Sequence, residues 1–171
     1  LVWKKDLIVL HHNSLSEDIP IFVLFRAMGV CSDQEIMQLI DPSGELADLL
    51  MSSLHENVDL KIQTQEQALQ FIERRIRISQ FSGVESTQEE KARPLYKARE
   101  FLRSMVLPHI ESTLDDFRRK AVFVSLMTRW LLKSNNDSTI LDGRDFFGNK
   151  RLELAGELMD LLFEDLFKTF N

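Results

Sequence analysis

The sequence is poor in the residues that make covalent or metal-based crosslinks. Its 171 residues include one cysteine, Cys31, so an internal disulfide and a cysteine-based zinc site are both excluded. The six glycines and four prolines are too few for a collagen-like or linker-like chain. With 44% hydrophobic and 28% charged residues, the composition is typical of a globular protein. We therefore expect an ordinary apolar core in a reducing compartment.

Long apolar runs and an excess of positive charge are also lacking. The longest apolar run, residues 19–25, contains Pro20 and is far shorter than the roughly 20 residues that a membrane span requires. The start of the chain has no pattern of a secretory signal. A net charge of −6 argues against nucleic-acid binding by the whole surface but leaves room for a local basic patch. Because the first residue is Leu1, we expect a piece of a longer protein.

Apolar residues recur at helical spacing through most of the chain, between recognisable capping signals. Ser32 with Glu35, and Thr64 with Gln67, have the spacing of capping boxes at helix N-termini. The expected helices run from Pro20 to Gly29, from 32 to 40, from about 45, from 64, from 95 to just before Pro108, from 114 to 133 and from about 149 to 170.

One short strand is expected near the start of the chain. Residues 6–11, Asp-Leu-Ile-Val-Leu-His, are rich in apolar and β-branched residues, but no partner strand is obvious downstream. The fold class is therefore mainly α (α+β), a helical domain with one N-terminal strand left from a small sheet. We expect residues 1–171 to form a single domain, with residues 79–92 as a mobile loop because they are the least hydrophobic stretch.

Patterns of catalytic or metal-binding residues are missing. The four histidines are not spaced as metal ligands, and Cys31 has no neighbouring base in the sequence. No glycine-rich phosphate-binding loop is present. We therefore expect neither a catalytic residue nor a metal site in this chain.

Cations cluster at residues 74–77, 118–120 and 144–151. For the first two clusters we expect solvated faces. The third cluster lies at the entry to the last helix, where positive charge opposes the helix dipole. Two interpretations stay open for it: neutralisation by Asp142 and Asp145, or a phosphate or polynucleotide backbone nearby.

The third cluster lies within a segment that carries a family resemblance. Residues 142–156 read Asp-Gly-Arg-Asp-Phe-Phe-Gly-Asn-Lys-Arg-Leu-Glu-Leu-Ala-Gly, and residues 161–168 read Leu-Leu-Phe-Glu-Asp-Leu-Phe-Lys. They closely resemble the second-largest (β-like) subunit of multisubunit DNA-directed RNA polymerases, and most of all the RNA polymerase III paralogue. Further blocks occur in the family order at residues 15–21, 25–30, 32–36, 107–110 and 118–121.

The resemblance implies the lobe region, a largely helical block with a small sheet that forms one side of the DNA cleft. Its implied partners are other RNA polymerase subunits, initiation factors and DNA, with no membrane, in the nucleus. By the same resemblance, Arg144, Asp145, Lys150 and Arg151 are the candidate nucleic-acid contacts. Arginine and lysine neutralise phosphates, whereas an aspartate accepts from a base amino group or orients an arginine.

The resemblance also limits the role of this chain. It implies part of a nucleotidyltransferase without its catalytic centre, and a catalytic Mg²⁺ bound by another subunit. Gly143 stands where the family usually has a second aspartate, which puts any role of that carboxylate in doubt. Phe146 and Phe147 replace more polar aromatic residues and remove a hydroxyl donor.

Two other functions compete with a polymerase lobe. The first is a stand-alone helical protein–protein interaction module that uses the last helix, and it predicts a stable oligomer and binding insensitive to salt. The second is a small enzyme that uses Cys31 or a histidine, and it predicts turnover that is lost on Cys31→Ala.

Overall fold

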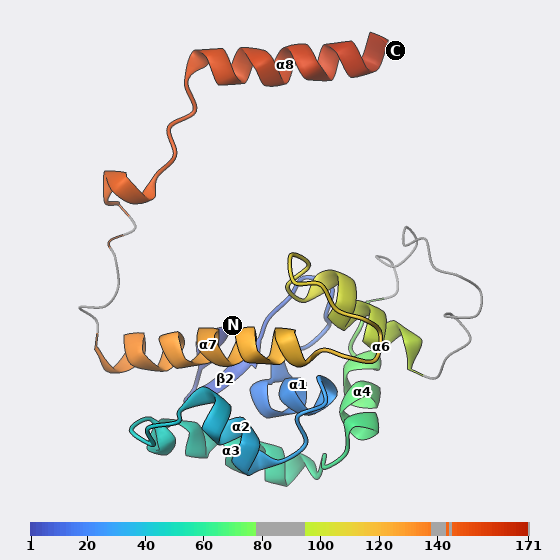
Figure 1. The fold of residues 1–171 in the computed structure, drawn as a ribbon, viewed down its shortest axis with the longest axis vertical. Coiled ribbons are helices and arrows are strands. Elements are labelled where there is room, and N and C mark those ends of the chain that lie inside the picture. Colours follow the sequence, from blue (N-terminus) through green and yellow to red (C-terminus); the bar gives the residue numbers. More distant parts are fainter. Residues whose placement is uncertain (78–94, 138–142, 144, 171) are drawn as a thin grey trace. The chain divides into compact units, whose positions relative to one another are not determined.

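The computed structural model describes residues 1–77, 95–137, 143 and 145–170. The chain divides into two compact units, Leu1–Asn136 and Asp137–Asn171 (Figure 1). The loop expected at residues 79–92 lies outside the described residues. That both units belong to one domain stays a prediction.

Unit 1 begins with a small antiparallel sheet rather than a single strand. Its strands are β1 (Val2–Lys4), β2 (Leu7–Leu10) and β3 (Ile19–Pro20), in that spatial order. The expected strand at residues 6–11 therefore exists as β2, but it is the central strand, with Trp3 opposite Ile8 on one side and Leu10 opposite Ile19 on the other.

The turn between β1 and β2 explains why the sequence did not reveal this pairing. Lys5 and Asp6 form a two-residue connection, and both have positive φ, 47° and 64°. Two-residue turns with positive φ match the twist of the strands. In sequences they are usually recognised by an Asn-Gly or Asp-Gly pair, because these residues have little steric penalty at positive φ. The prediction of a mainly α fold with a small sheet is confirmed.

The first four helices lie close to their predicted positions. Thr64 and Gln67 form the complete capping box, whereas Ser32 Oγ accepts from the Glu35 amide (3.5 Å) without the reciprocal bond. These helices are α1 (Ile21–Ala27), α2 (Asp33–Ile40), α3 (Ala47–Leu60) and α4 (Gln65–Glu73).

Helix α1 lies at the centre of unit 1. All seven of its residues are buried, and it packs against α2, α3 and α4 (Figure 1). One of the seven is charged: the Arg26 guanidinium forms an ion pair with Asp33 (2.5 Å) and donates to Asn57 Oδ1 (3.4 Å). Burial of an arginine requires such partners, so Arg26 fixes α1 to both α2 and α3.

A buried lysine joins α7 to the helix before it. Helix α6 (Tyr96–Glu100) continues into a π-helical turn, η2 (Phe101–Met105). Lys120 of α7 (Arg118–Asn136) is fully buried, and its Nζ donates to the carbonyl oxygens of Leu102 (2.8 Å), Arg103 (2.6 Å) and Val106 (2.7 Å). Since the last carbonyls of a helix have no partner within it, the ammonium group acts as a cap. For Lys120, the expected solvated face is therefore wrong.

Arg129 of α7 caps α2 in the same way. Its Nε donates to the Ile40 carbonyl (2.5 Å) and its Nη2 to the Leu39 carbonyl (3.1 Å). Helix α7 therefore uses two cations, one at each of two neighbouring helix ends, where positive charge also complements the helix dipole.

The three arginines within residues 74–77 differ in their surroundings. Arg74 and Arg77 are exposed, as expected. Arg75 instead pairs with Glu17 (2.9 Å), and its guanidinium lies 3.5 Å from the centre of the Phe71 ring. One of the three arginines of this cluster therefore stabilises the fold, while the other two face water.

Unit 2 consists of a short 3-10 turn, η4 (Phe147–Asn149), and helix α8 (Ala155–Phe170). No residue of α8 is buried. Among the described residues, no helix is long and apolar enough to cross a membrane. The large apolar side chains exposed after residue 151 are Leu152, Leu154, Leu158, Met159, Leu161, Leu162, Phe163, Leu166, Phe167 and Phe170.

Candidate nucleic-acid interface

The segment before α8 is held in a compact turn by its own hydrogen bonds. The Phe146 amide donates to the Gly143 carbonyl (3.1 Å), and the Asn149 amide donates to the Phe146 carbonyl (3.0 Å). The Asn149 side chain also donates to the Gly143 carbonyl (3.3 Å). These hydrogen bonds of Gly143 and Asn149 thus fix the path of the chain just before Lys150 and Arg151.

Gly148 lies directly against an aromatic ring. A Cβ atom added at Gly148 would lie 2.6 Å from Phe146 Cε1, so any side chain there would displace the ring. Phe146 and Phe147 are nevertheless 68% and 79% exposed. The segment therefore presents two aromatic side chains to solvent next to its charged residues.

The structure brings two of the four predicted site residues together. Lys150 Nζ lies 3.3 Å from Asp145 Oδ1, and the Asp145 side chain is fully exposed. Arg151 is exposed and forms no ion pair with a described residue. Arg144 lies outside the described residues, as does Asp142, one of its two proposed neutralising neighbours. Internal neutralisation thus holds for Lys150 and leaves Arg151 available to another anion.

The helix-dipole argument for an anion at this place is wrong. Helix α8 begins at Ala155, not near Asn149, and residues 151–154 have no regular secondary structure. Lys150 and Arg151 consequently lie outside the first helical turn, where the dipole acts. The first turn carries Glu157 instead, which suits the dipole. Any attraction of Lys150 and Arg151 for a phosphate therefore comes from their charge and exposure, and not from the helix dipole.

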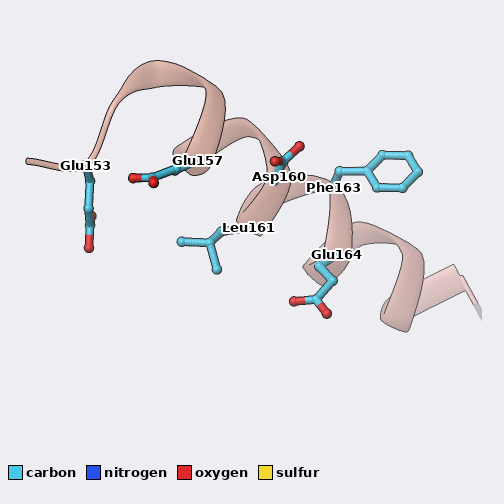
Figure 2. A pocket seen from close by; sticks show the side chains of 6 residues that line it. All are labelled: Glu153, Glu157, Asp160, Leu161, Phe163 and Glu164. Atoms are coloured by element: carbon cyan, nitrogen blue, oxygen red, sulfur yellow. The ribbon is translucent and has the colours of Figure 1, made fainter.

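Helix α8 itself is acidic. A hollow along it is lined by Glu153, Glu157, Asp160, Leu161, Phe163 and Glu164. Figure 2 shows Glu157, Asp160 and Glu164 along the helix and Glu153 on the segment before it, with Leu161 between Glu157 and Glu164. Because carboxylates repel phosphate, this acidic surface does not suit DNA.

In the part of the chain that the structure describes, residues with catalytic potential do not converge. The described residues contain no group of three or more histidines, cysteines or acidic residues that could hold a metal ion. Cys31 is exposed and unbonded. His11 pairs with Asp18 (2.6 Å), and hydrogen bonds from Lys4 and then His11 hold the pKa of the Asp18 carboxyl below its usual value. This exposed group joins the strands β1 and β2 to β3 and has no features of a catalytic site.

Sequence reasoning missed what α7 presents to solvent. Helical spacing predicts that Phe117, Ala121, Val124, Thr128 and Leu131 face inward. The first four are buried, whereas Leu131 is half-buried and Leu132 beside it is the fully buried residue of that turn. The opposite side of the helix is also apolar: Val122, Phe123, Leu126, Met127 and Trp130 are all exposed. The signal was a second set of apolar residues at helical spacing, offset from the buried set.

Comparison with known proteins gives the family. The family model for RNA polymerase Rpb2, domain 2, matches residues 3–153. The DNA-directed RNA polymerase III subunit RPC2 of Schizosaccharomyces pombe is 42% identical over 172 residues, which is 100% of this chain. The subunit of the same name from Drosophila melanogaster is 40% identical over 95% of the chain. The DNA-directed RNA polymerase II subunit RPB2 of Encephalitozoon cuniculi is 35% identical over 90% of it.

These relatives are much longer than this chain. It covers 14% of the length of the S. pombe and D. melanogaster proteins and 13% of that from E. cuniculi. The family match nevertheless includes the sheet, the helices of unit 1 and the turn at residues 143–151. The chain belongs to the RNA polymerase Rpb2, domain 2, family.

Proposed function

We propose that this chain is the lobe of the second-largest subunit of a DNA-directed RNA polymerase III in the nucleus. The observation that carries the proposal is the 42% identity with a polymerase III subunit across the whole chain. The chain forms one wall of the DNA cleft and docks other polymerase subunits or initiation factors on its outer face. The enzyme is a nucleotidyltransferase whose catalytic Mg²⁺ is held by another subunit.

Within this lobe, Lys150 and Arg151 contact the phosphates of downstream DNA or of the fork. Arg151 is exposed and has no ion pair among the described residues, so it neutralises a phosphate without first breaking a bond. The Lys150–Asp145 pair is solvent-exposed, and such pairs contribute at most about 1 kcal/mol. A phosphate therefore replaces Asp145 at little cost.

Charge reversal at these two residues is expected to weaken the binding of fork DNA by the assembled polymerase. The logarithm of the DNA-binding constant falls linearly with the logarithm of the salt concentration, and each phosphate contact to duplex DNA contributes about 0.9 to the steepness of this line. Loss of two phosphate contacts therefore makes the line less steep by about 1.8. The measurement compares Lys150→Glu/Arg151→Glu with the unchanged polymerase in a salt titration on fork DNA.

A matched control carries the same change in charge elsewhere. Lys97 and Lys168 are exposed, and Lys168 already pairs with Glu164 (3.5 Å). Lys97→Glu/Lys168→Glu is expected to leave the slope unchanged. An equal slope for all three polymerases would remove the proposed contact.

The exposed helix α8 favours a second candidate, a stand-alone interaction module. Ten large apolar side chains after residue 151 are exposed, and patches of this kind mark surfaces that meet other proteins. For this candidate, binding of the partner responds little to salt, whereas DNA binding by a lobe falls steeply with salt.

A further inference from the structure

The solvent-facing side of α7 combines apolar residues with positive charge. Val122, Phe123, Leu126, Met127 and Trp130 are between 37% and 62% exposed. Their spacing of three and four residues places them in one row along the helix, which we call the α7 stripe. At one side of the stripe, the His109 ring packs edge-on against the Phe123 ring, with 5.4 Å between the two ring centres.

A cation stands at each end of the α7 stripe. Arg119 precedes Val122 by three residues and Lys133 follows Trp130 by three, so both share the exposed side of the helix. Both are exposed, and neither forms an ion pair with a described residue. At 1.5 Å per residue, the two positions are about 21 Å apart along the helix axis.

The charges of α7 select its partner. From Arg118 to Asn136 the helix contains five cations and no acidic residue. Lys120 and Arg129 cap neighbouring helices, and Arg118 pairs with Glu35 (2.9 Å), so Arg119 and Lys133 are the cations left on the exposed side. A second copy of the stripe would bring like charges together, so pairing between two copies is disfavoured. A surface with an apolar centre and a cation at each end is complementary to an amphipathic helix with acidic residues at both ends.

We propose that the α7 stripe is the docking site for an acidic amphipathic helix of another polymerase subunit or initiation factor. This inference rests on the proposed function, because the partner belongs to the assembled polymerase. The partner helix has an apolar face for the five stripe residues and acidic residues about 14 positions apart, which match Arg119 and Lys133. Trp130, the largest and most exposed of the five, is the main anchor for this helix.

The test is photo-crosslinking in a polymerase purified with the full-length subunit. Trp130→p-benzoylphenylalanine is expected to crosslink to a different polypeptide, within a helix that has acidic residues about 14 positions apart. Met127→p-benzoylphenylalanine, one turn away on the same stripe, is a second position in case the first disturbs assembly. Val58→p-benzoylphenylalanine on α3, where Val58 is 61% exposed, is the matched control and is expected not to give this product.

A second variant examines the charges. Arg119→Glu/Lys133→Glu is expected to weaken retention of the crosslinked partner about tenfold, since each reversal removes one attraction and adds one repulsion of up to about 1 kcal/mol. Retention unchanged by this double reversal would overturn the proposal. So would a crosslink from position 130 or 127 to the same subunit or to a second copy, or no crosslink at all.

The result also separates this inference from the function on which it depends. A wild-type subunit that does not co-purify with any polymerase overturns the proposed function. A wild-type subunit that does co-purify, combined with no crosslink to another polypeptide from the α7 stripe, overturns the docking site alone.

Discussion

Replacement of Lys120 by methionine is expected to lower the free energy of unfolding of unit 1 by about 3 kcal/mol, because a buried polar group without a partner costs about 1–3 kcal/mol. Methionine fills similar space, but it leaves the carbonyls of Leu102, Arg103 and Val106 without the ammonium group that they now share. Thermal and chemical unfolding of the 171-residue chain measure the loss, which corresponds to a fall in Tm of about 10 °C.

Lys133→Met is the matched control for this substitution. Lys133 lies on the same helix but is exposed, so its replacement is expected to change stability by less than about 0.5 kcal/mol. Equal stability of the two variants would contradict the capping role of Lys120.

The dependence of the loss on pH is a second signature of Lys120. Burial, and after it the nearby Arg103, lowers the pKa of Lys120 to about 8, whereas Glu100 opposes the shift. In the unfolded chain a lysine titrates near pH 10.4. Between these two values the unfolded state binds more protons, so this group's contribution to stability rises with pH. The difference in free energy of unfolding between the unchanged chain and Lys120→Met should therefore increase from pH 8 to about pH 10. A difference that stays constant over this range would contradict the burial of this amine.

In the isolated chain, removal of residues 137–171 is expected to abolish a weak, concentration-dependent association, distinct from a stable oligomer, without lowering the Tm. Among the described residues, every buried apolar side chain lies at or before Leu132, so the core of unit 1 keeps all of these members. The deleted part carries the exposed apolar residues of α8, which favour association in water. Sedimentation measures the change in mass, and thermal unfolding measures the Tm.

A less drastic variant separates the apolar surface from the length of the chain. Leu158→Lys/Leu162→Lys keeps all 171 residues but interrupts the apolar side of α8, and it is expected to associate less as well. Loss of cooperative unfolding in the truncated chain would contradict an independent unit 1. A full-length chain that sediments as a monomer would contradict association through α8.

The sequence predicted the helices better than the sheet, for a physical reason. Helix positions follow from repeated apolar residues and from local caps such as Thr64 with Gln67, and both signals lie within a few residues of each other. The sheet depends on a turn at Lys5 and Asp6, both with positive φ. A Lys-Asp pair is not a recognised sequence signal for such a turn. Its third strand has two residues, too few for any periodic pattern.

The roles of the cations could not be predicted from their clustering. Lys120 stands beside Arg118 and Arg119 in the sequence, yet it is buried while both arginines are exposed. Which side of α7 faces the core decides this, and that orientation depends on contacts with residues that are distant in sequence, such as Leu102. The ion pair of Asp145 and Lys150 could be expected from the sequence, because the two residues are close in sequence and meet within one turn; their contact with nucleic acid stays a prediction.

Photo-crosslinking from position 147 tests the proposed DNA contact most directly. Phe147 is 79% exposed and lies in the turn that precedes Lys150. In an assembled polymerase bound to fork DNA, Phe147→p-benzoylphenylalanine is expected to crosslink to the DNA, whereas Trp130→p-benzoylphenylalanine should crosslink to protein. A crosslink from position 147 to protein alone, with none to DNA, would contradict a lobe that holds its basic turn against the nucleic acid.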